Sequence, residues 1–252
     1  MLHTGKHHAE RDQQFRYIYE QQESFCDSKD PRISVDTKKK ELIGQFKNKG
    51  QTWCPQGEKV NDHDYPSDAS GRAAPYGIYD PERNAGHVCV TTSHDTADLA
   101  VDAVADWWKR NQKHYPTASR LMIEADGGGS NGSRSRRYKL RLQEFADASG
   151  LKITVCHYPP GTSKWNVIEH RLFSQISATW AGYVLSSLAI LLGFILRTTT
   201  RTGLKVTATH FKKTYETGLK VSKKEFEAIQ LTRHEVCPQW NYTIRPKPKI
   251  TK

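Results

Sequence analysis

The spacing of apolar residues predicts an alternation of short strands and amphipathic helices along most of the chain. Short apolar runs bounded by turn residues predict strands at residues 33–36, 76–80, 87–90, 121–126 and 152–157. Apolar residues at three-to-four spacing predict helices at residues 10–30, 95–110, 134–149 and 165–180. The core order is β-β-β-α-β-α-β-α, which predicts an α/β fold with a mixed sheet and flanking helices.

Local signals predict where several helices begin or end. Ser93 or Asp95 is expected to cap the helix at 95–110, and Gly150 is a stop signal for the helix at 134–149. After residue 196 the periodic pattern weakens. A capping box formed by Ser222 and Glu225 then predicts one further short helix.

Residues 181–196 form an uncharged and largely apolar run. Two serines and two glycines interrupt it, and it is shorter than the about 20 apolar residues that a membrane-spanning helix needs. We therefore expect a buried helix here and no membrane contact. Residues 1–6 have no apolar core, so we expect no signal peptide.

The chain is basic, because Lys plus Arg total 38 against 27 for Asp plus Glu, which gives a formal charge of +11. This excess favours a polyanionic partner, with nucleic acid ahead of an anionic membrane. The five cysteines are widely spaced and include no C-x-x-C pair. Their pattern argues against a disulfide scaffold and a zinc knuckle, and it suits a reducing cytosol.

Three carboxylates fall at informative places in this pattern. Asp36 ends the first predicted strand, Asp126 ends the fourth, and Glu169 lies on the helix at 165–180. If the first and fourth strands are neighbours, the two aspartates meet at one sheet edge, and the helix can bring Glu169 to the same place. Carboxylates brought together repel each other unless cations neutralise them, and clusters of oxygen ligands prefer Mg²⁺ or Mn²⁺. Two such ions suit an in-line phosphoryl displacement.

Each of these acids also has an ordinary interpretation. Asp36 fits a strand-end turn residue, Asp126 fits a partner for the amides of the following glycine loop, and Glu169 fits a solvated helix acid. The prediction of a site depends on the three placements taken together. On the helix, Asn166 and Phe173 share the face of Glu169, while an apolar stripe beside it is expected to pack on the sheet.

Basic residues surround the predicted acids. The candidate DNA-binding side chains are Lys38, Lys39, Arg134, Arg137, Lys164, Asn166 and His170. Cations placed in this way would bind phosphates whether or not the acids act, so a non-catalytic DNA-binding module remains the alternative. A solvated helix face is an equally ordinary explanation for the two arginines.

The glycine loop also fits the dinucleotide-binding pattern G-x-G-x-x-G, with Gly127, Gly129 and Gly132. That interpretation needs an acid at the end of the next strand to hold the ribose, and the strand ends instead at Cys156 and His157. Asp126, directly before the first glycine, would also repel a pyrophosphate. The context therefore disfavours a dinucleotide site.

Three blocks of the sequence resemble the Rhodopirellula-type DDE transposases of bacterial insertion sequences. They read ISVDTKKKE at residues 33–41, ADGGGSNG at 125–132 and PPGTSKWNVIEHRLFS at 159–174. PYGIYD at 75–80 and WNY at 240–242 also match. The resemblance extends roughly from residue 10 to residue 246.

The resemblance implies a ribonuclease H-like fold, with Asp36, Asp126 and Glu169 as the DDE triad that holds two Mg²⁺ or Mn²⁺ ions. It further implies DNA cleavage and strand transfer, transposon ends and target DNA as partners, a homo-oligomer in a synaptic complex, and a place near the nucleoid of the bacterial cytoplasm. The expected organisation is a helical lead-in at 1–30, a catalytic domain at 31–200 and an extension with a basic tail at 201–252.

Two departures from the family pattern qualify these expectations. Family members carry an N-terminal helix-turn-helix region that recognises the ends of the element, and only a short segment precedes Asp36 here. Residues 183–196 are also more apolar than the family would lead us to expect. A truncated or decaying copy would fit both departures, so we expect the catalytic chemistry rather than complete site-specific transposition.

Overall fold

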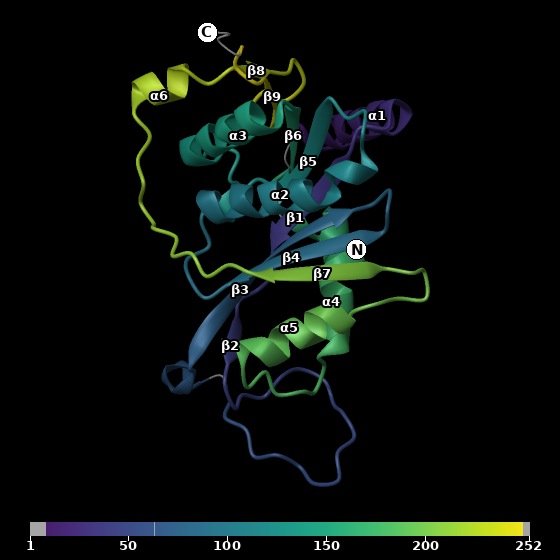
Figure 1. The fold of residues 1–252 in the computed structure, drawn as a ribbon, viewed down its shortest axis with the longest axis vertical. Helices are drawn as coiled ribbons and strands as arrows, with labels where there is room; N and C mark the ends of the chain where they lie inside the picture. Colours follow the sequence, from purple (N-terminus) through teal and green to yellow (C-terminus); the bar gives the residue numbers. More distant parts are fainter. Residues whose placement is uncertain (1–8, 63, 249–252) are drawn as a thin grey trace.

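The structure, a computed structural model, describes residues 9–62 and 64–248 (Figure 1). The predicted absence of a signal peptide concerns residues 1–6, which lie outside this description, as do the last four residues of the predicted basic tail. Among the described residues, no helix is both long enough and apolar enough to cross a membrane.

A mixed sheet forms the centre of the molecule, as the sequence predicts. Its strands are β1 (Arg32–Thr37), β2 (Glu41–Ile43), β3 (Gly71–Asp80), β4 (Ala85–Thr91), β5 (Arg120–Asp126), β6 (Lys152–Tyr158), β7 (Lys205–His210), β8 (Leu231–Arg233) and β9 (Asn241–Ile244). The order across the sheet is β7-β4-β3-β1-β5-β6-β9-β8, with β2 beside β3. The pairs β1–β5, β5–β6 and β4–β7 are parallel.

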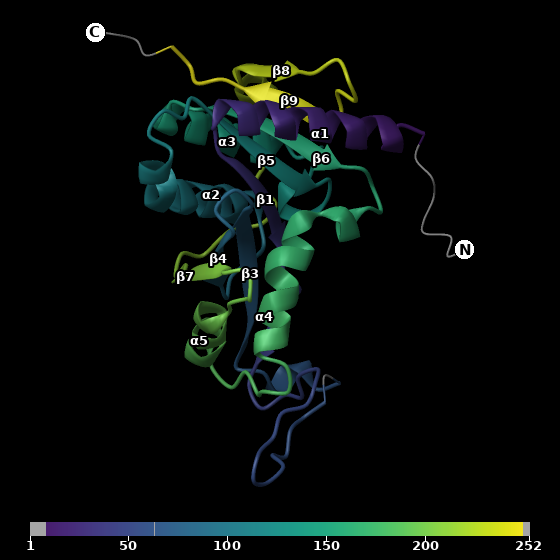
Figure 2. The ribbon, with the colours of Figure 1, turned by 90° about the vertical axis from the view of Figure 1, so that its right-hand side faces the viewer.

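Helices cover both faces of this sheet (Figure 2). They are α1 (Arg11–Ser28), α2 (Ala97–Asn111), α3 (Arg136–Ser149), α4 (Ser174–Thr179), α5 (Leu188–Arg197) and α6 (Lys223–Glu227). One face packs on α2 and α3 through the largest core cluster, which includes Val35, Ile78 and Ile123. On the opposite face α1 covers Met122 and Cys156, while α5 and the segment leading into α4 cover Val88 and Val90 of β4.

The described part of residues 201–252 contributes strands to both ends of the sheet. Strand β7 pairs in parallel with β4, and β9 pairs antiparallel with β6. The predicted capping box is confirmed, because the hydroxyl of Ser222 accepts from the backbone N–H of Glu225 and the Glu225 carboxylate accepts from the N–H of Ser222. The division of the chain at residues 30 and 200 stays a prediction.

The cap of α2 differs from the expected one. Thr96, rather than Ser93 or Asp95, accepts a hydrogen bond from the backbone N–H of Leu99. Thr96 has the extended backbone that places an N-cap hydroxyl over the first turn. The end of α3 is as predicted, since Gly150 has φ 78° and its N–H caps the helix.

The helix predicted at 165–180 begins later than expected, after an interruption at Asn166. A 3₁₀ turn covers Ser163–Trp165, and a continuous helical segment then runs from residue 167 to residue 179. It contains a π-helical turn at Glu169–Phe173 that leads into α4 (Ser174–Thr179). A π turn accommodates an extra residue and is common at functional sites. Phe173 in this segment is buried, whereas Trp165 is 54% exposed.

The apolar run at 181–196 is only partly helical. Helix α5 begins at Leu188, one residue after its cap Ser187, and the chain before it forms a turn. Leu191 and Ile195 are buried, whereas Ile190 and Leu196 are exposed. The predicted buried helix is therefore shorter than expected and covered on one side only.

Two glycines allow the π turn to lie against the sheet. A Cβ atom on Gly77 of β3 would stand 2.3 Å from the ring of Phe173, and one on Gly86 of β4 would stand 2.5 Å from Leu172. Neither distance is tolerated between real atoms, so larger residues at these positions would push the π turn away from the sheet. The predicted apolar stripe beside Glu169 is confirmed, since Ile168, Leu172 and Ile176 are all fully buried.

Candidate active site

Asp36 and Asp126 lie at the ends of adjacent parallel strands. In the register of β1 and β5, Val35 is opposite Ala125, so the two aspartates follow at neighbouring positions. Alternation along a strand places Asp36 on the same face as Ser34, the face that packs on the π turn. The condition that the first and fourth predicted strands be neighbours is therefore met, since β1 lies beside β5.

Glu169 reaches this strand edge from the first position of the π turn. Its carboxylate lies close enough to that of Asp36 for its charge to raise the pKa of Asp36. The structure thus brings the three predicted acids together, each half-buried, from β1, β5 and the segment before α4.

The acids disturb one another's ionisation. Burial and the negative charges of Asp126 and Glu169 raise the pKa of Asp36 to about 8, against the opposing effect of the Thr37 N–H that donates to its Oδ1. Burial, with the charge of Glu169, also raises the pKa of Asp126, although a hydrogen bond from Asn166 opposes this shift. Excess negative charge on a set of oxygen ligands fits a hard divalent cation such as Mg²⁺ or Mn²⁺.

A buried hydrogen-bond network holds the strands and the helical segment together. Asn166 donates through Nδ2 to Asp126 Oδ1 and to the Val35 carbonyl, each at 3.2 Å. The hydroxyl of Ser34 donates to Asn166 Oδ1 at 2.5 Å and accepts from the Ile168 N–H at 3.2 Å. Asn166 is fully buried, so its predicted contact with DNA is replaced by a role in positioning Asp126.

A cleft of about 780 Å³ opens beside the acids. Among the residues that line it are Asp36, Asp126, the glycines at 127–129, Lys38, Lys39, Lys40, Arg134, Ser163 and Trp240. The glycine loop turns away from the end of β5, with Gly129 at φ 60°, and leaves Asp126 at the wall of the cleft. A cleft lined by Asp36, Asp126 and several cations suits a polyanionic chain that must approach a metal site.

Some of the predicted DNA-binding cations are exposed, whereas others are paired with acids of the protein. Lys39 and Arg134 are exposed at the cleft, and Lys164 and His170 are exposed on the neighbouring segment. Lys38 instead is buried, donates to Glu41 at 2.7 Å and lies over the ring of Trp180. The remaining predicted cation, Arg137, forms two hydrogen bonds with Asp98 of α2. Both Lys38 and Arg137 are therefore neutralised within the protein.

One acid of the cleft was missed by the sequence analysis, which considered it only as a helix cap. Asp95 lines the cleft and accepts a hydrogen bond from the hydroxyl of Thr37, the residue after Asp36. Its position just before a predicted helix gave no sign that the loop folds back over β1.

The structure also disfavours a dinucleotide site. Within the glycine loop, Gly129–Asn131 form a 3₁₀ turn, and α3 begins only at Arg136. The next strand, β6, ends at Tyr158 without an acid. The loop therefore does not lead directly into a helix N-terminus that would hold a pyrophosphate.

A mixed sheet with two strand-end aspartates facing a helix-borne glutamate defines a ribonuclease H-like DDE fold. The chain is similar to two solved structures, the Mos1 transposase paired-end complex with the left transposon end (TM-score 0.51) and the Mos1 mariner paired-end complex with Mn (TM-score 0.50). Each match has 10% identity and covers 76% of this chain and 55% of the Mos1 chain, so this chain spans about half the Mos1 length.

The family is identified by sequence. The model of the Rhodopirellula transposase DDE domain matches residues 2–246, and the chain belongs to this family. No curated protein matches the chain. The resemblance expected from the three sequence blocks is thus confirmed.

The raised pKa of Asp36 predicts a cost to stability. In the unfolded chain an aspartate ionises near pH 4, whereas Asp36 in the fold holds its proton up to about pH 8. The folded state therefore binds more protons than the unfolded state between these values, and stability falls as the pH rises through this window. We expect Asp36→Asn to stabilise the chelator-treated protein by about 1–3 kcal/mol above pH 8 and very little near pH 4.

Urea unfolding at the two pH values measures this difference. Asp64→Asn, a change of an exposed acid, serves as the matched control and should show no such trend. A gain in stability that is equal at both pH values would contradict the electrostatic origin of the effect.

Proposed function

We propose that this chain is the catalytic domain of a DDE transposase, which cleaves DNA strands and joins them to a target in a reaction that depends on divalent metal ions. The observation that carries the proposal is the convergence of Asp36, Asp126 and Glu169, whose burial and mutual repulsion favour a bound cation. Membership of the transposase family supports the same reaction class.

The residues present fit two Mg²⁺ or Mn²⁺ ions held by the three carboxylates. When bound, such ions supply the Lewis acidity that activates a water or a 3′-hydroxyl and stabilises the leaving oxygen of an in-line displacement. Asn166, through its bond to Asp126, fixes the direction in which that carboxylate faces the cleft. We propose no covalent intermediate with the protein.

The proposed substrate contacts lie at the rim of the cleft. Lys39 and Arg134 are placed to bind the phosphates of a strand that passes over Asp126, and Lys164 and His170 extend the basic surface beside Glu169. Both Mos1 structures are paired-end complexes, and one of them is with the left transposon end. By analogy, we propose transposon-end DNA as substrate and an assembly of at least two chains, because joining two ends requires two sites.

The alternative is a basic DNA-binding module without activity. The exposed cations fit both functions. The three carboxylates, which lie together at a cost to stability, have a role only in the proposed enzyme. An assay for metal-dependent DNA cleavage distinguishes the enzyme from the DNA-binding module.

Supercoiled plasmid and Mn²⁺ provide the test, since they require no knowledge of the terminal sequence. We expect nicking by the unmodified chain, and a loss of about 100-fold or more in Asp126→Asn and Glu169→Gln, because each change removes a metal ligand. Glu235→Gln, on an exposed loop, should keep full activity. DNA binding should persist in all variants. If Asp126→Asn and Glu169→Gln nicked the plasmid as fast as the unmodified chain does, the assignment would be refuted. If the unmodified chain bound DNA but gave no Mn²⁺-dependent product, the result would favour the DNA-binding module.

The salt dependence of DNA binding tests the proposed phosphate contacts. Replacing Arg134 by Gln should weaken binding to all sequences and reduce the slope of log affinity against log salt by about 1, because one phosphate contact is lost. Lys152→Gln is the control, since Lys152 is exposed at the opposite end of the β5–β6 pair. Fluorescence anisotropy with a labelled duplex measures both slopes. An unchanged slope for Arg134→Gln would remove this residue from the interface.

A further inference from the structure

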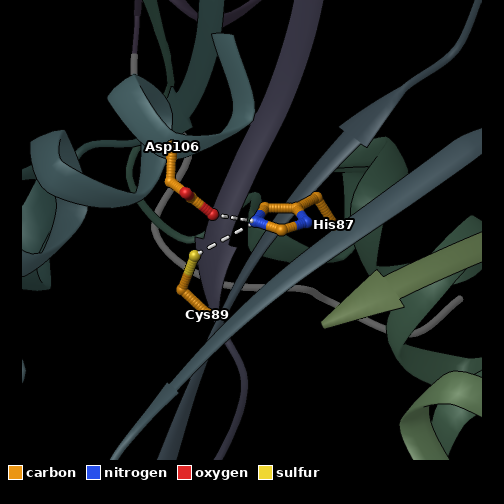
Figure 3. Close-up of side chains that lie close together, drawn as sticks. All are labelled: His87, Cys89 and Asp106. Atoms are coloured by element: carbon orange, nitrogen blue, oxygen red, sulfur yellow. Dashed lines mark hydrogen bonds and ion pairs between the residues drawn. The ribbon is translucent and has the colours of Figure 1, made fainter. Parts of the chain in front are cut away.

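A second group of side chains that could hold a metal ion lies on the opposite face of the sheet from the acids. His87 and Cys89 alternate along β4 toward α2, and Asp106 extends from α2 toward them (Figure 3). One ligand atom from each of the three residues lies within 4.8 Å of the others. His87 and Cys89 are buried, and the proposed transposase chemistry uses none of the three.

The geometry excludes a catalytic relay. In a thiol–imidazole–carboxylate relay the thiol and the acid occupy different nitrogens of the ring. Here both meet the same nitrogen, since His87 Nε2 is 2.9 Å from Asp106 Oδ2 and 3.4 Å from Cys89 Sγ. The three ligand atoms therefore converge on one point, as in a metal site.

The other ring nitrogen has the partner that a metal-bound histidine requires. His87 Nδ1 lies 2.8 Å from the hydroxyl of Thr207 on β7. That hydroxyl donates to the Gly86 carbonyl at 3.4 Å, which leaves its oxygen free to accept from Nδ1–H. A ring protonated at Nδ1 presents a lone pair at Nε2, and such outer partners commonly fix this tautomer in metal sites.

The chemistry of the ligands suits a small tetrahedral ion. Ligand atoms about 2.0–2.3 Å from zinc lie roughly 3.3–3.8 Å from one another. The 3.4 Å between His87 Nε2 and Cys89 Sγ lies in this range, whereas the 2.9 Å between His87 Nε2 and Asp106 Oδ2 is shorter, so the Asp106 carboxylate must move outward when the ion binds. Thiolate, imidazole and carboxylate together favour Zn²⁺ over Mg²⁺ or Ca²⁺. We propose that His87 Nε2, Cys89 Sγ and Asp106 Oδ2 bind one Zn²⁺ ion.

The surroundings explain how the charge is balanced. Binding releases the thiol proton of Cys89, so the ion is neutralised by one thiolate and one carboxylate. Asp106 Oδ2 also accepts from Arg110 Nε at 2.8 Å and from the Thr209 hydroxyl at 3.1 Å. The half-exposed Arg110 can move to the other carboxylate oxygen, and Thr209 or a water can complete the coordination. No C-x-x-C pair is needed, since strand alternation brings His87 and Cys89 together.

The site would fasten three elements that are distant in the sequence. It links β4 and α2 directly, and through Thr207 and Thr209 it reaches β7, the strand at one end of the sheet. Because it ties these buried elements together, the proposed site would stabilise the fold.

Cobalt binding to the chelator-stripped full chain tests the proposal. A cobalt–thiolate bond gives a strong charge-transfer absorption in the near ultraviolet, which the oxygen ligands of the DDE site cannot produce. We expect one equivalent of this absorption, displaced by Zn²⁺, in the unmodified chain and in Asp36→Asn. This readout is independent of nicking, so the zinc site and the proposed function can fail separately.

Cys89→Ala should weaken cobalt and zinc binding by about 100-fold or more. Cys156→Ala is the matched control, because Cys156 is also fully buried in the sheet but lies outside the cluster. Asp106→Asn, which preserves the shape of a half-buried side chain, should weaken binding by at least about tenfold while the circular dichroism spectrum stays unchanged. Absence of the absorption from the unmodified chain, or equal binding by Asp106→Asn and the unmodified chain, would overturn the proposal.

Discussion

The repulsion among Asp36, Asp126 and Glu169 is the constraint on which the rest of the structure depends. Two parallel strands end side by side with their acids on one face, and burial keeps the pKa of Asp36 at about 8. This arrangement of three carboxylates is unfavourable by itself, so other contacts must offset its repulsion. The Ser34–Asn166 network ties both strands to the helical segment, and the absent side chains of Gly77 and Gly86 let the π turn press against the sheet. The packing of Leu172 and Phe173 on the sheet therefore keeps Glu169, which is on the same π turn, close to the two aspartates despite the repulsion.

The two faces of the sheet have different chemistry. The face that carries the acids offers oxygen ligands and a basic rim, which suits hard cations and a phosphate chain. The face beneath α2 buries the sulfur and nitrogen ligands of the proposed zinc site in the core. Because the ligand sets differ in softness, each site is expected to select its own metal.

Much of the sheet was predictable from the sequence because strands and helices leave different apolar periods. That pattern was enough to predict that Asp36 and Asp126 each end a strand, whereas the pairing of the two strands was a condition that the sheet had to meet. It could not predict the π turn, which depends on the tertiary fit of Phe173 against Gly77. It also could not show that Asn166 is buried or that Glu41 neutralises Lys38, since both facts depend on contacts that local spacing does not encode. The place of Asp95 in the cleft and the convergence of Asp106 with His87 and Cys89 needed the fold itself.

The central claim is that the three carboxylates form one site for hard divalent cations. Its most direct measurement is the anomalous scattering of Mn²⁺ in crystals of the chain grown with a duplex. The account predicts manganese peaks bounded by Asp36, Asp126 and Glu169, which disappear in crystals of Asp126→Asn. Manganese that binds elsewhere, with the three carboxylates free of metal in the presence of DNA, would contradict it.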